Sequence, residues 1–280
     1  MTPPMHPWLE LAIDAAQCAS GVIRMLVAGA ADLQVRTKRP KDFVTKVDLA
    51  SERVIVDALL AAEPTHAVLG EEHAALHGAA GADHVWIVDP VDGTMNLVHG
   101  IPAYAVSIAL AVRGFLEVGV VLDVPGDELF AAARGHGAWA LRGGVWRRLA
   151  VSPCATLDAA VVATSAPRTA DPDDALAWQA FAAVMRGAAA VRRGGSAALD
   201  LAWVAAGRHD ACYDLGLAPW DVAAGALLVR EAGGLVTGFG GEAGVLSIRE
   251  TLAAGPSLHA VLCRILQPLA ARGAAPAGTG

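Results

Sequence analysis

The sequence predicts a mixed α/β protein built from two closely packed lobes, an α+β lobe followed by an α/β lobe. In the first half, apolar runs separated by short turns are typical of antiparallel strands. After about Ser152, short apolar runs instead alternate with helical stretches. No long Ser-, Gly- or Pro-rich linker divides the halves. We therefore expect lobes at residues 1–152 and 153–270, followed by a flexible tail at 271–280.

The first elements are two helices and two short buried strands. Apolar residues recur at helical spacing over residues 8–30. Asp48 is a suitable N-cap for a second helix, which we expect to end before Pro64. The apolar runs at 68–69 and 85–88 lead directly into carboxylates, as expected for strands that deliver a side chain to their ends.

The remaining elements divide between the two predicted lobes. In the first lobe we expect a hairpin and meander with strands at 104–112, 115–122, 128–133, 137–141 and 145–151. In the second lobe we expect strands at 159–163, 188–191, 210–213 and 234–237, alternating with helices at 173–186, 196–206 and 222–232.

Composition excludes several classes of function. A net charge of −7 argues against a general nucleic-acid-binding protein, and the one basic run, residues 36–41, reads as a local solvated loop. Four widely spaced cysteines without a C-x-x-C pair indicate buried thiols. We find no apolar span of about 20 residues and no signal peptide at the N-terminus. These features predict a cytoplasmic protein that does not bind membranes.

The hexapeptide DPVDGT, which begins at Asp89, reads either as a turn or as a site. Asp-Gly is a common turn and proline stiffens the bend. Alternatively, Asp89, Asp92 and the carbonyl of Val91 supply three hard oxygens, which suit Mg²⁺ or Mn²⁺ better than zinc. Gly93 and Thr94 then offer backbone N–H groups at a helix start, a position that attracts phosphate.

Three other acidic residues each have an ordinary interpretation when taken singly. Glu71, in the sequence GEE, follows a predicted strand and could belong to a solvated pair. Asp221, in the sequence PWD, and Asp48 could each simply cap a helix.

Together these segments resemble the inositol monophosphatase family of metal-dependent, lithium-sensitive phosphatases, over roughly residues 8–270. The matching segments are DFVTKVD (42–48), GEE (70–72), DPVDGTMNLVHGIP (89–102), GGSAALD (194–200) and PWDVAAGALLVREAGG (219–234). The resemblance implies a layered αβαβα fold of the sugar-phosphatase type, with an antiparallel-sheet N-terminal lobe and an α/β C-terminal lobe. It also implies a homodimer.

Carried over to this sequence, the resemblance implies a metal site, a proton path and a substrate site. The metal ligands would be Glu71, Asp89, the Val91 carbonyl, Asp92 and Asp221, holding two or three Mg²⁺ ions. The catalytic residues would be Glu71, Asp48 and Thr94, with Thr94 bonded to Asp48 and orienting the water that attacks phosphorus in line. The substrate residues would be Gly93, Thr94, Gly195, Ser196, Ala197 and Asp214.

The substrate is less strongly indicated than the chemistry. Family members that act on inositol commonly have Glu where this chain has Asp214, so a hydroxyl contact could be lost or mediated by water. Inositol monophosphate is the leading prediction. Histidinol phosphate, fructose 1,6-bisphosphate and 3′-phosphoadenosine 5′-phosphate are alternatives. A hypothesis from another class is a non-catalytic regulatory protein that binds a partner with the same fold.

Overall fold

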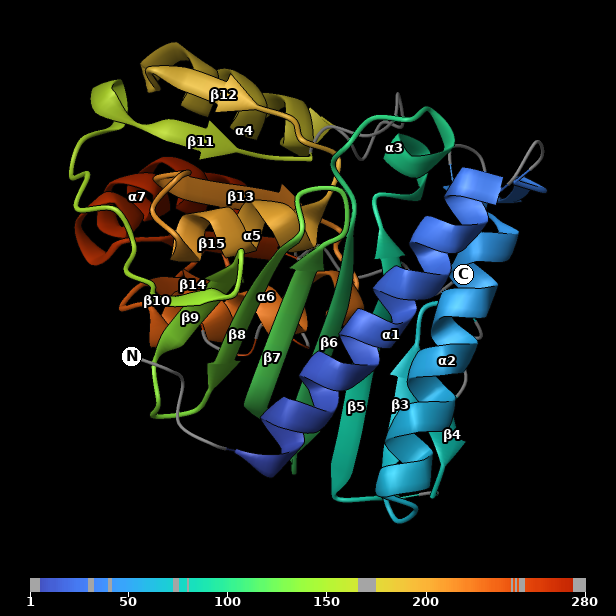
Figure 1. Cartoon of the computed structure of the whole chain (residues 1–280). Coiled ribbons are helices and arrows are strands. Elements are labelled where there is room, and N and C mark those ends of the chain that lie inside the picture. The colour runs from blue at the N-terminus through green and yellow to red at the C-terminus, as the bar shows by residue number, and fades with distance from the viewer. Residues whose placement is uncertain are drawn as a thin grey trace, which may run out of the picture.

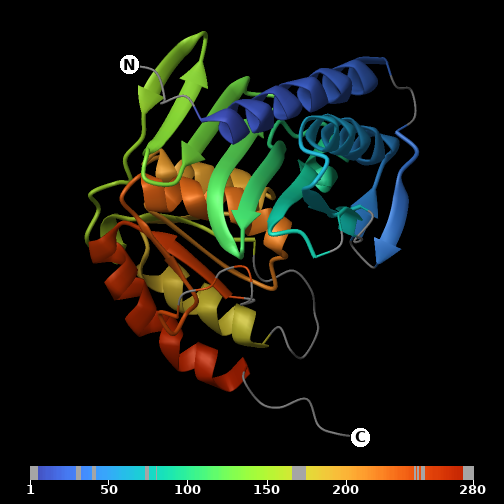
Figure 2. The ribbon, with the colours of Figure 1, turned by 90° about the horizontal axis from the view of Figure 1, so that it is seen from below.

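The fold consists of five stacked layers of helices and sheets. The computed structural model describes residues 6–29, 33–39, 42–72, 76–79, 81–165, 175–242, 244, 246 and 250–273. A pair of helices covers an eight-stranded sheet, a second pair lies between this sheet and a five-stranded sheet, and a third pair covers the far side (Figures 1 and 2). This arrangement confirms the predicted αβαβα layering.

The eight-stranded sheet is antiparallel except for one parallel pair of strands. In spatial order it contains β10 (Val145–Arg148), β9 (Ala138–Arg142), β8 (Glu128–Ala133), β7 (Phe115–Asp123), β6 (Ala105–Val112), β5 (His84–Asp92), β3 (Ala67–Gly70) and β4 (Leu76–Gly78). Strands β3 and β5 are parallel. The predicted hairpin and meander are therefore present, with β5 as an additional buried strand beside them.

Helices α1 (Pro7–Gly29) and α2 (Lys46–Ala62) cover the outer face of this sheet. They lie against each other and share a core with β5, β6 and β7 (Figure 1). Helix α1 is long and apolar enough to span a membrane, which contradicts the expectation that no such segment exists. Its Leu9, Ala12, Ala16 and Ile23 are buried against the sheet and α2, so one face of the helix belongs to the core.

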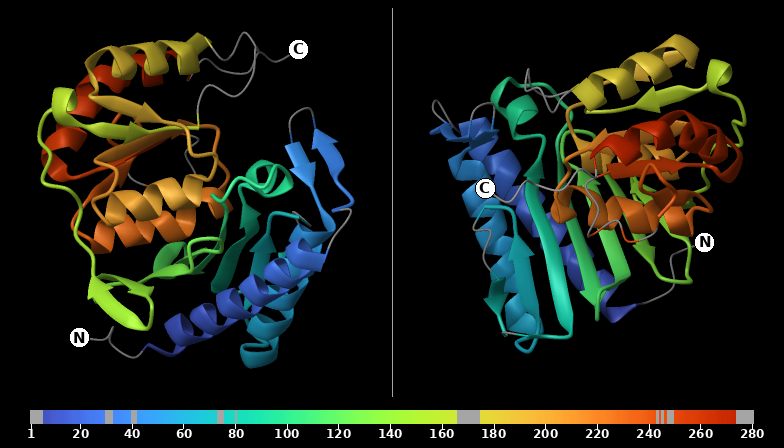
Figure 3. Two further views of the ribbon diagram at one scale, coloured as in Figure 1. Left: turned by 45° about the horizontal axis from the view of Figure 1, so that its top comes forward. Right: turned by 180° about the vertical axis from the view of Figure 1, so that it is seen from behind.

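Helices α5 (Ala197–Ala205) and α6 (Pro219–Glu231) lie between the two sheets. The five-stranded sheet has the order β12 (Ala190–Arg192), β11 (Val161–Ala163), β13 (Ala211–Leu215), β15 (Glu250–Ala254) and β14 (Leu235–Thr237). Helices α4 (Ala175–Gly187) and α7 (Pro256–Gly273) cover its far side (Figure 3, left). One continuous core joins both sheets through α5 and α6, and the division at residue 152 stays a prediction.

Several local predictions were wrong. The basic run is not a loop: its first four residues form β1 (Arg36–Arg39), which pairs with β2 (Asp42–Val44), while residues 40–41 lie outside the described residues. Neither β15 nor α7 was predicted. Helix α7 also includes residues 271–273 of the predicted tail, and residues 274–280 lie outside the described residues.

Asp48 is not the N-cap of α2. The N-cap is Thr45, and Asp48 occupies the third helical position of a capping box. The Asp48 carboxylate accepts hydrogen bonds from the backbone N–H of Thr45, at 2.9 Å, and from its hydroxyl, at 2.5 Å. Thr45 thus caps the start of α2, and one oxygen of Asp48 stays available for a tertiary contact.

A change of register in β5 prepares the site. Side chains three residues apart in a regular strand point to opposite faces. The pairing of β5 with β6 shifts between Asp89 and Asp92, so the strand is irregular there. Both carboxylates consequently line the same cavity.

Candidate active site

A cavity of 460 Å³ lies where the end of β5 meets the loops and helix starts around the five-stranded sheet. Its lining residues are Phe43, Glu71, Asp89, Val91, Asp92, Gly93, Thr94, Met95, Ser165, Arg193, Gly195 and Asp221. Eight of the predicted site residues are among them, although they come from segments up to 150 residues apart in the chain. The cavity is therefore assembled by the tertiary fold around the DPVDGT turn.

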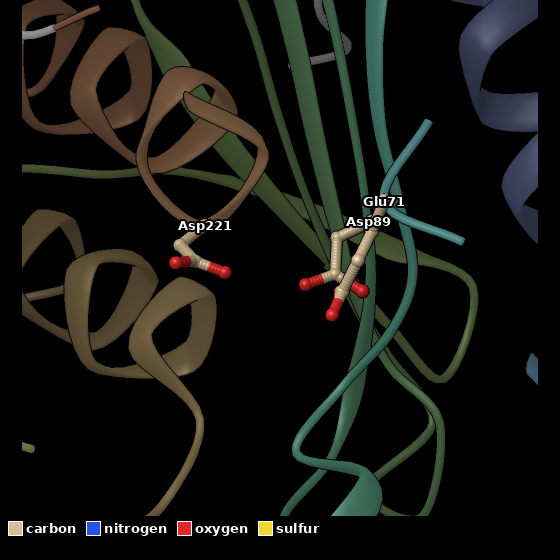
Figure 4. A group of neighbouring side chains, drawn as sticks. All are labelled: Glu71, Asp89 and Asp221. Carbon is tan, nitrogen blue, oxygen red and sulfur yellow. The ribbon is translucent and has the colours of Figure 1, made fainter. Parts of the chain in front are cut away.

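Three carboxylates converge in this cavity. Glu71 follows β3, Asp89 lies near the end of β5, and Asp221 lies in the first turn of α6 (Figure 4). One carboxylate oxygen from each lies within 4.8 Å of the other two. Hard oxygen ligands at this separation can be bridged by a divalent cation such as Mg²⁺. The donor set therefore fits the metal site implied by the sequence.

The electrostatics of Asp89 point the same way. Its side chain is buried, and burial together with the charges of Glu71, Asp92 and Asp221 raises the pKa of this carboxyl well above its usual range. A cation placed among these groups would lower the pKa of Asp89 again and favour the ionised carboxylate. The backbone N–H of Val91 donates to Asp89 Oδ1 at 3.0 Å and holds the side chain in place.

Asp92 lines the cavity but is also bonded to the start of α5. Its Oδ2 accepts from the Ser196 hydroxyl at 2.6 Å and from the backbone N–H of Ala198 at 2.7 Å. Asp92 is not one of the three clustered carboxylates. It connects the end of β5 to the helix that follows the predicted substrate turn.

Thr94 connects the cavity to buried Asp48. Its hydroxyl lies 2.7 Å from Asp48 Oδ1 and 3.1 Å from the Val91 carbonyl oxygen. Burial raises the pKa of Asp48, although hydrogen bonds from Thr45 and Thr94 lower it in part. A carboxylate with a raised pKa accepts a proton more readily. The Thr94–Asp48 contact expected from the sequence is thus present in the structure.

Gly93 permits the sharp turn that exposes this hydroxyl. It precedes the short helix α3 (Thr94–Val98) and has φ of 99°, a left-handed conformation that favours glycine. A side chain at this position would also lie 2.9 Å from the Ala103 carbonyl oxygen.

Two buried residues that support the site were missed by sequence reasoning. Glu52 is 1% exposed, and its Oε2 accepts from the backbone N–H of Glu72 at 2.9 Å, which holds the turn carrying Glu71. Ser51 donates to the Pro90 carbonyl at 2.9 Å and so fixes the bend between Asp89 and Val91. Both lie on α2, one turn after Asp48, a spacing that the helical periodicity of α2 could have indicated.

The predicted substrate residues separate in the structure. Gly195 lines the cavity, with φ of 81°. Ser196 and Ala197 do not line it, and the Ser196 hydroxyl is bonded to Asp92. Asp214 is only 2% exposed and also lies behind the cavity surface.

Four residues that line the cavity were not predicted: Phe43, Met95, Ser165 and Arg193. Arg193 is the one cationic side chain among the described residues of this lining. Phe43 and Met95 lie inside the segments DFVTKVD and DPVDGTMNLVHGIP, and Arg193 directly precedes GGSAALD, so their positions in the chain were the available signals. Ser165 lies about 70 residues beyond the DPVDGT turn in the chain, and no sequence pattern connects them.

A model of the inositol monophosphatase family matches residues 5–270 of the chain. The protein named Nus factor SuhB from Pseudomonas aeruginosa is 44% identical over 267 residues, which are 94% of this chain and 97% of the relative. The Escherichia coli K12 protein of the same name is 43% identical over 237 residues, 85% of this chain and 87% of its own.

Solved structures show the same fold. The extragenic suppressor protein suhB from Bartonella henselae superposes with a TM-score of 0.88 at 37% identity, covering 94% of this chain and 99% of its own. Inositol monophosphatase from Anabaena gives a TM-score of 0.81 at 35% identity, covering 93% and 95%. A structure described as inositol monophosphate-bound SaIMPase-II gives 0.78 at 28% identity, covering 96% and 97%.

Proposed function

This chain belongs to the inositol monophosphatase family, and from that membership we propose that it is a Mg²⁺-dependent phosphomonoesterase that hydrolyses inositol monophosphate to inositol and phosphate. The observation that carries the proposal is the convergence of Glu71, Asp89 and Asp221 in one cavity, with ligand oxygens within 4.8 Å of one another. Three carboxylates so close together, one of them buried, need a cation between them if all are to stay ionised.

Glu71, Asp89, Asp92, Asp221 and the Val91 carbonyl would hold two or three Mg²⁺ ions. Bound there, the ions would stabilise the charge that develops on the phosphoryl and leaving oxygens and would lower the pKa of the attacking water. Four ionised carboxylates and a phosphate monoester together carry close to −6, which two or three divalent cations largely neutralise.

The chain itself supplies the proton path. A water beside Thr94 would lose a proton to the Thr94 hydroxyl oxygen as the hydroxyl proton moves to Asp48 Oδ1, 2.7 Å away. The raised pKa of Asp48 favours acceptance of this proton, and its burial keeps bulk water away from the carboxylate. The backbone N–H groups of Gly93 and Thr94, at the start of α3, would orient the phosphate oxygens.

The substrate proposal rests on the family and on the SaIMPase-II structure described as bound to inositol monophosphate. Histidinol phosphate, fructose 1,6-bisphosphate and 3′-phosphoadenosine 5′-phosphate remain alternative substrates for the same chemistry. Several relatives carry the name Nus factor, which supports a second candidate function: a regulatory binding protein with the same fold. The carboxylates, Thr94 and Asp48 together favour the enzyme, since a binding protein has no physical need for them.

We propose a cytoplasmic homodimer, as the family resemblance implies. Light scattering on the purified chain should give twice the chain mass of 28.6 kDa. A mass equal to one chain would remove the dimer from the proposal.

The central test is a phosphate-release screen with Mg²⁺ as the only metal, over inositol 1-phosphate, histidinol phosphate, fructose 1,6-bisphosphate and 3′-phosphoadenosine 5′-phosphate. Asp89→Asn should lower turnover by at least ~10³-fold, because it removes a charged ligand while keeping the acceptor for the Val91 N–H. The surface variant Asp57→Asn serves as the control, because its side chain is exposed on α2.

Three results would change the conclusion. Retained turnover in Asp89→Asn would overturn the metal site, and release from histidinol phosphate alone would replace inositol phosphate as substrate. No release from any of the four would favour the binding-protein alternative.

Millimolar Li⁺ should inhibit, since it can occupy a cation position without supplying a divalent charge, and an insensitive enzyme would contradict the lithium-sensitivity expected from the family.

A further inference from the structure

The three clustered carboxylates belong to two different layers of the fold. Glu71 follows β3 and Asp89 lies on β5, so both are carried by the eight-stranded sheet. Asp221 instead projects from the start of α6, which packs on the inner face of that sheet (Figure 4). The distance from Asp221 to the other two carboxylates therefore depends on how α6 is seated on the sheet.

A hydrogen bond ties the first turn of α6 to the eight-stranded sheet. The Ser107 hydroxyl on β6 donates to the Trp220 carbonyl oxygen, with 3.1 Å between the two oxygens, and Ser107 is only 1% exposed. Trp220 directly precedes Asp221, whose Oδ2 accepts from the backbone N–H of Ala218 at 2.8 Å. The bond from Ala218 holds the Asp221 carboxylate relative to the helix. The bond from Ser107 holds the helix relative to the sheet.

Ser107 is also the partner of Asp89 across the sheet. The two residues lie opposite each other in the antiparallel pairing of β5 with β6, and the register shift in β5 begins only after this pair. The side chains of opposite residues point to the same face, with Cβ atoms about 5 Å apart. One serine is therefore next to Asp89 through strand pairing and next to Asp221 through its hydrogen bond, although the two carboxylates come from distant parts of the chain.

Two further contacts between α6 and the eight-stranded sheet lie farther along the helix. On β7, a Cβ atom at Gly119 would lie 2.9 Å from the Ala224 carbonyl oxygen, so helix and strand are in close backbone contact there. At the last residue of α6, the Glu231 carboxylate accepts from the backbone N–H groups of Gly135 and Gly137, each at 2.8 Å. These contacts hold the middle and the end of the helix, away from the carboxylate at its start.

We propose that Ser107 is a positioning residue that fixes the separation of Asp89 and Asp221 and thereby gives the metal site its preference for Mg²⁺ over the larger Ca²⁺. Mg²⁺ requires near-ideal octahedral geometry with ligand oxygens at about 2.0–2.1 Å, whereas Ca²⁺ accepts flexible geometry at about 2.3–2.6 Å. A loosely held Asp221 therefore weakens Mg²⁺ binding more than Ca²⁺ binding. This inference rests on the proposed function, because it concerns the cation that the proposed reaction requires.

Ser107→Ala removes the hydroxyl with little disturbance of the fold. Alanine already occupies positions 105 and 109 on the same face of β6. Trp220 lies within α6, so its carbonyl keeps its place in the helical hydrogen-bond ladder. Mg²⁺ should bind about 5- to 10-fold more weakly, a range that runs from the loss of one neutral hydrogen bond to the mildest losses of a group that orients a metal ligand. Ca²⁺ affinity should change by less than about 2-fold.

The test measures binding of the metal ions alone. Electron paramagnetic resonance counts free Mn²⁺, and the Mg²⁺ and Ca²⁺ affinities follow from the concentration of each ion that displaces bound Mn²⁺. Glu231→Ala is the matched control, because it removes the contacts at the opposite end of α6. It should lower stability in urea and leave both affinities unchanged. Ser107→Cys keeps a weak donor and should bind Mg²⁺ with an affinity between those of wild type and Ser107→Ala.

Turnover supplies an independent readout. The two substrates are inositol 1-phosphate and phenyl phosphate, whose alcohol has no hydroxyl beyond the ester oxygen. With both, Ser107→Ala should raise the Mg²⁺ concentration that gives the half-maximal rate by about 5- to 10-fold. The rate at saturating Mg²⁺ should stay close to that of wild type, because all metal ligands are intact.

The outcomes separate the two proposals. If wild type binds no Mn²⁺, the metal site of the proposed function fails and this inference fails with it. If wild type binds Mn²⁺ but Ser107→Ala leaves Mg²⁺ affinity unchanged, or weakens Mg²⁺ and Ca²⁺ equally, the inference alone is overturned. It is also overturned if Glu231→Ala weakens Mg²⁺ binding as much, since the cause would then be a general loosening of α6, or if only one of the two esters shows the raised Mg²⁺ requirement.

Discussion

The two sides of the cavity differ in how their polar groups are held. On the eight-stranded side, Asp89 and Thr94 are tied to backbone atoms of the same DPVDGT turn and to a residue of the helix packed beneath it. On the five-stranded side, Ser165 and Arg193 follow separate short strands and are joined by contacts between distant residues. The first side can keep its geometry when the alcohol changes. We therefore expect it to govern kcat and the second side to govern KM.

The strongest way to break this comparison is to remove the Thr94 hydroxyl. Thr94→Ala should lower kcat by about 10²- to 10³-fold with little change in KM, because the proton acceptor between the attacking water and Asp48 is lost. Steady-state kinetics on inositol 1-phosphate would measure both constants. Thr94→Ser retains the hydroxyl and should retain most of kcat. A loss in Thr94→Ala that appears mainly in KM would place substrate binding, and not proton transfer, at this residue.

The same difference explains which parts of the site could be predicted. The eight-stranded side is encoded in a contiguous turn, and the carboxylates that complete it follow apolar strand runs or open a helix, so short patterns indicate them. Ser165 is held by Asp214, 49 residues later in the chain. The sequence shows that Asp214 replaces the Glu common in family members that act on inositol. That Asp214 contacts Ser165 depends on the tertiary structure.

Local reasoning failed for the same reason elsewhere in the fold. Strand β15 is a five-residue segment at the interior of the five-stranded sheet, between β13 and β14, and its Ala-rich sequence gives little strand signal. The sequence around Asp48 is typical of an N-cap, but in the structure Thr45 occupies that position. Strands β6 and β7 and residues 85–88 of β5 were predicted because burial on both faces makes these segments largely apolar.

A second way to sharpen the comparison uses a buried pair on the five-stranded side that lies away from the cavity lining. His209 Nδ1 is 3.6 Å from Asp200 Oδ1, and burial lowers the pKa of His209 to about 4. Because the unfolded imidazole titrates near 6.5, the unfolded chain binds a proton first as pH falls. The stability contributed by neutral His209 is thus complete above pH 6.5 and is lost as pH falls through 4, by up to about 3 kcal/mol.

Urea denaturation of wild type and His209→Asn at pH 7 and pH 4 measures this effect. The difference between the two proteins isolates the imidazole, because Asp200, whose pKa burial raises well above its usual range, is present in both. The variant should lose less stability than wild type between these pH values, and its kcat at pH 7 should be nearly unchanged. Parallel pH profiles for the two proteins would contradict the assigned pKa, and a large fall in kcat would show that this pair serves the chemistry.

The smallest effect is expected where one side chain joins the two sides. Asn96 Nδ2 donates to the Ala103 carbonyl at 2.6 Å and to the Gly194 carbonyl at 2.8 Å, and it packs against Gly195, where a Cβ atom would lie 2.9 Å from it. Asn96→Ala removes both hydrogen bonds and should lower the free energy of unfolding by about 2 kcal/mol. Since it also frees the Gly195 turn, KM for inositol 1-phosphate should rise while the phenyl phosphate KM stays constant. Asn96→Asp keeps the side-chain volume but places a carboxylate against two carbonyl oxygens, so it should be at least as destabilising. A stable Asn96→Asp protein with unchanged KM would mean that the two sides are held together by their shared core alone.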